Sequence, residues 1–74
     1  MQFYQKYIEI DSSVRFGKPV ILGTRISVAD ILEMLANGMS FKEIIVDFPQ
    51  INETQILACL KYASDKERKL AVAV

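Results

Sequence analysis

The strongest pattern in the sequence is a helical spacing of hydrophobic residues that occurs three times in succession. In each run the marked positions fall at i, i+3, i+4 and i+7, which places them on one face of an amphipathic helix. The first two runs begin at Val28 and Phe41, and the third, whose apolar members follow a polar first residue, begins at Glu53. Short breaks at residues 37–40 and 49–52 separate the runs. The pattern predicts three helices, of which the second and third form a helix-turn-helix outline.

The residues around each run supply the signals that start and stop helices. Each run follows a residue that can cap a helix N-terminus, and the residue three positions further on can complete a capping box. The predicted pairs are Ser27 with Asp30, Ser40 with Glu43, and Asn52 with Gln55. Gly38 is expected to end the first helix in the left-handed conformation, and Pro49 to end the second. Nothing interrupts the third helix before about Lys69.

The phase of the three runs predicts a shared core. The residues expected to be buried together are Ile31, Leu35, Ile44, Ile45, Ile56 and Leu60. Cys59 is expected to be a small buried hydrophobe rather than a reactive thiol. The ring of Tyr62 is expected to pack at the edge of this core.

The first 26 residues favour strands and turns. Phe3 to Ile10 is rich in β-forming residues and predicts one strand, and Val20 to Leu22 predicts a second. Residues 17–19 are expected to form a turn around a proline. Gly23 is expected to bend the chain after the second strand, and Thr24 to support the bend.

The glycines of this segment resemble a nucleotide-binding phosphate loop only superficially. Five residues rather than four separate Gly17 from Gly23, and Thr24 stands where such a loop requires lysine. Nucleotide binding at this segment is therefore excluded.

The elements together predict one α+β domain over residues 1–74, with short N-terminal β-strands followed by a three-helix unit that contains the helix-turn-helix. Residues 1–26 form the strand-rich part, residues 27–69 the helical part and residues 70–74 an apolar tail. The chain has 74 residues, near the lower limit for a self-sufficient core, yet 51% of them are hydrophobic. We therefore expect a partner to cover some apolar surface, most simply in a homodimer with Phe3 to Ile10 at the interface.

Composition also excludes several classes of protein. The sequence has no run that could cross a membrane, no secretory signal and a single cysteine, so we expect a cytoplasmic protein. It has no histidine, which excludes zinc-finger spacings and histidine-based catalytic triads. Asp30 and Glu33 lie one turn apart, but without converging ligands they are better interpreted as a solvated face than as a metal pair. We expect no enzymatic activity and no cofactor.

Charge is distributed unevenly although the net charge is zero. Residues 1–27 carry four cations and two acids, residues 28–57 one cation and five acids, and residues 58–74 four cations and two acids. A phosphate-binding face would therefore have to use the two ends of the chain rather than its middle.

Five residues are candidates for nucleic-acid contacts. Lys18 and Arg25 can bind phosphate or the acidic active site of a nuclease partner, and Arg25 can equally cap carbonyls or pair with an acid inside the fold. On the third helix, Thr54 and Gln55 can approach bases, and Lys61 can contact a phosphate. The alternative for these three residues is a solvated helix face, which the neighbouring Glu53 favours.

Several sequence blocks resemble one known family. The blocks are Gly17–Ile21, Gly23–Ile26, Asn37–Ser40 with residues 43–45, Phe48–Ile51, and Ile56, Leu60, Tyr62 and Ala63. With these blocks, between about Ile8 and Ala63, the chain resembles a small bacterial antitoxin family that was formerly a domain of unknown function. Members are VapB-like, and their genes often lie beside those of PIN-like ribonuclease toxins. Two positions depart from the usual family pattern: Phe48 replaces a tyrosine and Gln50 replaces a histidine.

The resemblance implies a functional assignment that the spacing of residues does not. It implies the antitoxin of a type II toxin-antitoxin module, which neutralises a PIN-like RNase toxin and binds operator DNA as a dimer for autoregulation. A second interpretation is a protein-interaction inhibitor or adaptor that never contacts DNA, and the acidic middle of the chain favours it.

Overall fold

The computed structural model describes residues 3–13 and 15–72, which form a two-stranded antiparallel sheet beside three helices. The helices are α1 (Val28–Ala36), α2 (Phe41–Asp47) and α3 (Glu53–Val72). The predicted α+β class and the order of its elements are therefore confirmed. α3 runs three residues beyond the predicted end near Lys69 and includes part of the apolar tail, whose residues 73–74 lie outside the described residues.

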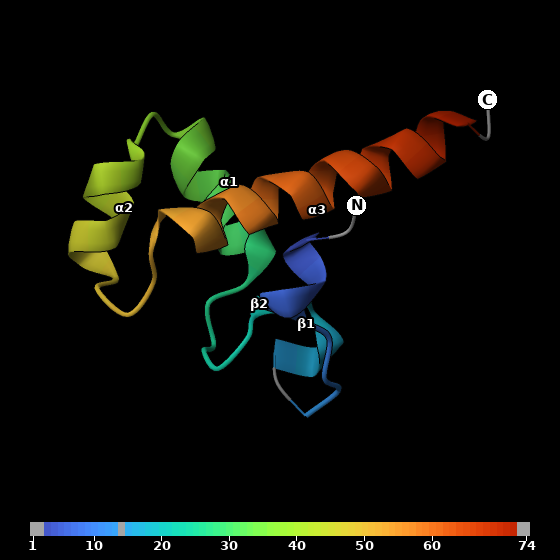
Figure 1. Cartoon of the computed structure of the whole chain (residues 1–74), viewed down its shortest axis with the longest axis horizontal. Coiled ribbons are helices and arrows are strands. Elements are labelled where there is room, and N and C mark those ends of the chain that lie inside the picture. The colour runs from blue at the N-terminus through green and yellow to red at the C-terminus, as the bar shows by residue number, and fades with distance from the viewer. Residues whose placement is uncertain (1–2, 14, 73–74) are drawn as a thin grey trace.

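The helices α1 and α2 lie beside the first half of α3 (Figure 1). α1 and α2 pack against this half, and the N-terminal 3-10 turn η1 (Phe3–Lys6) packs against α3 as well. The last turns of α3, in red, extend beyond the other elements (Figure 1). No helix in the described part of the chain combines the length and apolar character needed to span a lipid bilayer.

The N-terminal segment corrects one prediction. Phe3 to Ile10 is not one strand, because residues 3–6 form η1 and only β1 (Ile8–Glu9) is extended. The amide of Tyr7 donates to the carbonyl of Tyr4 at 2.8 Å, which closes this turn. The turn lets the Tyr4 ring meet the Tyr62 ring edge-on, with centroids 5.6 Å apart and planes at 88°. The tertiary aromatic contact therefore outweighs the β-propensity of the segment.

The second strand, β2 (Val20–Ile21), pairs with β1 so that Ile8 faces Ile21 and Glu9 faces Val20. The strands are joined through a second 3-10 turn, η2 (Arg15–Gly17). In this turn Phe16 has a φ of 59°, a left-handed conformation uncommon outside glycine, and its side chain is 98% exposed. Leu22, predicted in the strand, lies just beyond it, although its amide still donates to the carbonyl of Tyr7 at 2.7 Å.

All three predicted capping boxes are present. Their side chains accept from backbone amides at 2.7–3.3 Å, in the pairs Ser27 with Asp30, Ser40 with Glu43, and Asn52 with Gln55. Gly38 follows α1 with a φ of 93°, as expected for the residue that ends the helix. Phe48 caps the end of α2 before Pro49, also as predicted.

The core prediction is partly wrong. Ile31, Ile44 and Ile56 are fully buried in one cluster, as predicted. Leu35 and Ile45 are only partly buried against it. Leu60 is 37% exposed, because α3 turns Ala58 and Cys59 inward instead. Cys59 is buried as expected, and Tyr62 packs at the edge of the cluster.

Candidate functional site

The loop between β2 and α1 is a short turn held by the Thr24 hydroxyl. Thr24 Oγ1 donates to the carbonyl of Ile21 at 2.8 Å and accepts from the amide of Ile26 at 3.0 Å. Gly23 has a φ of 82°, and the amide of Ile21 donates to the carbonyl of Ile26 at 2.9 Å across the turn. The predicted bend and the supporting role of Thr24 are confirmed. The turn fixes the backbone on both sides of Arg25.

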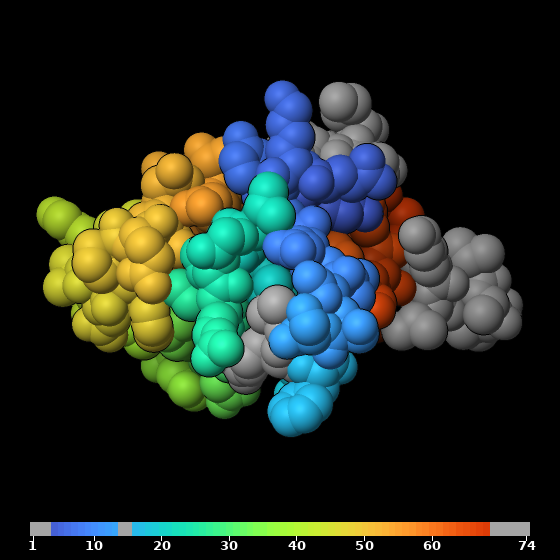
Figure 2. Space-filling model, turned by 90° about the horizontal axis from the view of Figure 1, so that it is seen from below, coloured from blue at the N-terminus to red at the C-terminus, as the bar shows by residue number. Residues whose placement is uncertain are grey.

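This turn lies at the surface. Figure 2 shows it in teal between the α2–α3 region in yellow and the N-terminal segment in blue. The side chain of Arg25 is exposed, and so is that of Lys18, just before β2. Both predicted cations are therefore accessible to a partner, carried on backbone that the sheet and the Thr24 turn hold in place.

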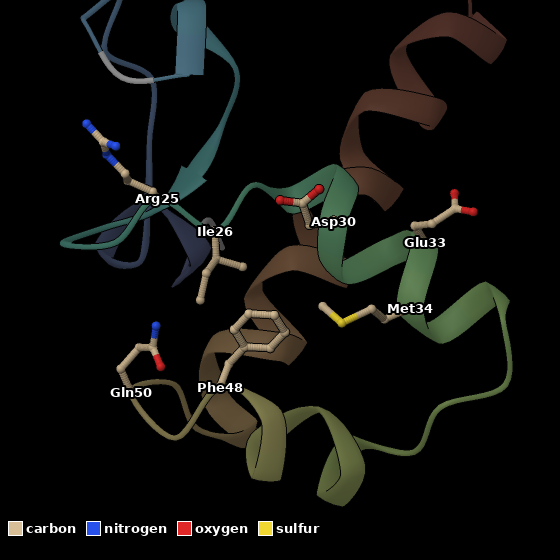
Figure 3. Close-up of a pocket in the computed structure, with 7 residues that line it drawn as sticks. All are labelled: Arg25, Ile26, Asp30, Glu33, Met34, Phe48 and Gln50. Atoms are coloured by element: carbon tan, nitrogen blue, oxygen red, sulfur yellow. The ribbon is translucent and has the colours of Figure 1, made fainter.

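Arg25 also lines a cleft of about 460 Å³ that three segments of the chain form together (Figure 3). The apolar side chains of Ile26, Met34 and Phe48 turn toward one another inside it (Figure 3). The remaining lining residues are Arg25, Asp30, Glu33 and Gln50. We call this the Arg25 cleft.

Charge separates the two sides of the Arg25 cleft. Arg25 and Gln50 lie on the side of the β2–α1 turn and the α2–α3 turn, whereas Asp30 and Glu33 project from α1 (Figure 3). Asp30 Oδ2 also accepts from the amide of Ser27 at 3.3 Å, so this carboxylate is part of the α1 capping box. An apolar cleft with charges of both signs is suited to the side chains of a protein partner, since the acids would repel a phosphate backbone.

The described residues that line the Arg25 cleft do not include Thr54, Gln55 or Lys61, the candidates on the third helix. Thr54 is exposed, as DNA contact would require. The amide oxygen of Gln55 accepts from the amide of Asn52 at 2.7 Å, so it is engaged in capping α3. Lys61 is half-buried on the next turns of the helix.

Asp65 pairs with two basic residues of α3, a role that was not predicted from the sequence. Its carboxylate lies 3.7 Å from Lys61 Nζ and 3.7 Å from Arg68 Nη1, at i,i+4 and i,i+3 spacing. Asp65 is only 8% exposed. Burial, and then hydrogen bonding to Asp65, raises the pKa of Tyr4 above its usual value. The helical spacing of Asp65 from two cations was the available signal.

The structure identifies no metal or thiol centre among the residues it describes. No three potential metal-ligating side chains gather within residues 3–13 and 15–72. Burial raises the pKa of the Cys59 thiol to about 12, so the thiol stays protonated at neutral pH.

A comparison with protein families identifies the family of the chain. A model of the family described as "Protein of unknown function (DUF433)" matches residues 8–63. The match includes both strands, α1, α2, the Arg25 cleft and the first half of α3. The chain therefore belongs to this family. Comparison with curated proteins and with solved structures gave no match.

Proposed function

We propose that the chain is the antitoxin of a type II toxin-antitoxin module and acts in the cytoplasm by binding a PIN-like ribonuclease toxin. In this proposal the chain has no catalytic role and inhibits by contact. It also represses its own operon by binding operator DNA as a dimer.

The observation that carries the proposal is the placement of Arg25. Its side chain is exposed on the fixed turn between β2 and α1, next to an apolar cleft. A guanidinium pairs with carboxylates in a planar, two-point geometry, and a nuclease active site rich in acids offers such carboxylates. Lys18 adds a second exposed cation just before β2. The Arg25 cleft can take an apolar side chain of the toxin beside this charged contact.

The direct experiment uses the ribonuclease encoded by the neighbouring gene. RNA cleavage is measured while the purified chain is added in increasing amounts. We expect full inhibition by the unchanged chain and at least about tenfold weaker inhibition by Arg25→Glu, because charge reversal places an acid against acids. Arg25→Gln should have a smaller effect.

Lys42→Glu is the matched control, because Lys42 is an exposed cation on α2 outside the cleft. It makes the same type of change without altering the proposed contact. Thermal melting of all variants separates loss of binding from loss of folding. Equal inhibition by Arg25→Glu and the unchanged chain would contradict the role of Arg25, and no inhibition by the unchanged chain would contradict the antitoxin proposal.

The second candidate function is inhibition without DNA binding. Three acids favour it, because Glu43 and Asp47 on α2 and Glu53 in the first turn of α3 are all exposed. In a DNA-bound helix-turn-helix these surfaces would approach phosphates, which the carboxylates repel. A mobility-shift measurement with the DNA upstream of the gene distinguishes the two functions.

A further inference from the structure

A second concave surface lies between α1 and α3, with a volume of about 310 Å³. Ala29 and Leu32 of α1 form one side of it, and Tyr62 and Ala63 of α3 form the other. Where the surface continues along α3 it is lined by Lys66 and Glu67, which are both exposed. We call it the α1–α3 groove. Its apolar lining and the small side chains on both sides would allow a helix to approach closely.

The same helix carries a segment that matches this groove. The last described residues of α3, 70–72, are uncharged and apolar in sequence. The last described turns of α3 extend beyond the other elements of the fold (Figure 1). Position 70 follows Ala63 by seven residues, Lys66 by four and Glu67 by three, which is the spacing of one helical stripe. The α3 residues that line the groove therefore belong to a helical stripe that is apolar toward the C-terminal end of the helix.

We propose that the α1–α3 groove binds α3 of a second copy of this chain, antiparallel, about a two-fold axis between residues 66 and 67. In this register Lys66 lies opposite Glu67 of the second copy, and Glu67 opposite its Lys66. Position 70 of each copy lies opposite Ala63 of the other, at the apolar part of the groove. The inference rests on the dimeric state in the proposed function. It assigns the dimer interface to this groove instead of Phe3 to Ile10, the segment expected from the sequence.

Charge complementarity supports a second copy of the chain as the occupant of the α1–α3 groove. A two-fold axis makes each contact occur twice, so a surface that binds itself must pair unlike charges across the axis. Lys66 and Glu67 are adjacent and opposite in charge, so they meet this requirement when the two helices are antiparallel. In a parallel pair, Lys66 would lie opposite Lys66 and Glu67 opposite Glu67. Lys66 Nζ lies 5.6 Å from the centroid of the Tyr62 ring, which keeps the cation beside the groove.

Charge reversal provides the first test. Sedimentation of the unchanged chain at about tens of micromolar, a range in which a functional dimer persists, should show a dimer. Lys66→Glu and Glu67→Lys should each weaken it at least about tenfold, because each places like charges opposite one another twice. An equimolar mixture of the two variants should dimerise again, since both cross-chain pairs then regain opposite charges.

Lys42→Glu on α2 is the charge control and should leave the dimer unchanged. A monomeric unchanged chain would overturn the inference. A dimer insensitive to both reversals would also overturn it, and would point to another face such as that of Leu57, which is 44% exposed on α3. Failure of the mixture to recover, with both variants folded by circular dichroism, would contradict the register.

Cysteine pairing provides a second test of the register. Ala63→Cys and Leu70→Cys variants are mixed and oxidised, while the native Cys59 stays buried. A disulfide between the two chains is expected. Ser64→Cys is exposed beside the stripe and should form much less disulfide with Leu70→Cys. No preference for position 63 over position 64 would overturn the register. Ribonuclease inhibition by the monomeric variants separates failure of this inference from failure of the antitoxin proposal, because toxin contact through Arg25 does not require the α1–α3 groove.

Discussion

Ile56 and Leu60 lie one helical turn apart on α3, yet only Ile56 is fully buried. Ile56→Ala should lower the free energy of unfolding by about 2–5 kcal/mol, because it removes buried methyl groups and leaves a cavity. Leu60→Ala should cost less than about 1 kcal/mol, since the Leu60 side chain already contacts solvent. Urea unfolding of both variants measures the difference. Equal losses would show that the phase of α3 differs from the one described.

The burial of individual residues was only partly predictable from the sequence. Periodicity identified Ile31, Ile44 and Ile56 because large aliphatic residues at helical spacing favour one face. On α3 two apolar stripes compete: the sequence predicted burial of both Leu60 and Cys59, and it did not predict burial of Ala58. The structure buries both smaller residues fully, and Cys59 belongs to the core cluster that also holds Ile31 of α1. Size complementarity between elements is a tertiary property that periodicity does not contain.

At the scale of elements, the caps of α1 and α2 are chemically alike but differ in burial. Ser27 is 1% exposed, whereas Ser40 is exposed. Ser27→Ala should cost about 1–2 kcal/mol, and Ser40→Ala about 0.5–1 kcal/mol, because water can replace the lost hydrogen bond only at the exposed cap. Thermal or urea unfolding measures both values. Ser64→Ala, in the exposed interior of α3, is the control and should be neutral or slightly stabilising. A larger loss at Ser40 than at Ser27 would contradict this explanation.

The helices were predictable because their boundaries depend on local chemistry. Each capping box joins residues three positions apart, and Gly38 ends α1 through its own conformation. The N-terminal strand was not, since its first half folds back toward Tyr62, a residue distant in sequence. The Arg25 cleft was likewise beyond the sequence analysis. Its residues come from the β2–α1 turn, α1 and the α2–α3 turn, and only the fold brings Phe48 beside Met34 (Figure 3).

At the scale of the whole molecule, the proposed dimer would fix the separation of the two third helices. Thr54 lies about 12.5 residues before the proposed two-fold axis, so two copies would place their Thr54 positions about 38 Å apart at 1.5 Å per residue along antiparallel helices. Successive major-groove half-sites are separated by about 34–36 Å. The dimer geometry is therefore compatible with one helix N-terminus in each half-site.

The charge distribution on α3 is unfavourable for DNA binding by this dimer, and it determines which variants can test that binding. Lys61 and Arg68 share the carboxylate of Asp65 at 3.7 Å, so the basic part of α3 is partly neutralised within the chain. The side chains of Lys61 and Arg68 are 36% and 66% exposed, so a phosphate can compete with the carboxylate for both cations. Asp65→Asn would release both cations, but Asp65 is buried and hydrogen-bonded to Tyr4, so this variant also changes that contact.

DNA binding is best tested at Lys61 and Thr54. Lys61→Ala should weaken binding to operator and scrambled DNA alike, and should reduce the slope of log affinity against log salt by about one unit, because one phosphate contact is lost. Thr54→Ala should instead lower the preference for the operator, since its exposed side chain lies where bases would be read. Thr54 is a better probe than Gln55, whose amide oxygen also caps α3.

The measurement is binding of each variant to both DNAs at several salt concentrations, with and without the toxin. Lys42→Glu serves as a charge control on α2. If the unchanged dimer shows no operator preference even with the toxin bound, the reading role of α3 is lost. If the same dimer still inhibits the ribonuclease, the function without DNA binding is supported. The exposed acids Glu43, Asp47 and Glu53 would then account for the lack of DNA binding by repelling phosphates, and the Arg25 cleft would bind the toxin.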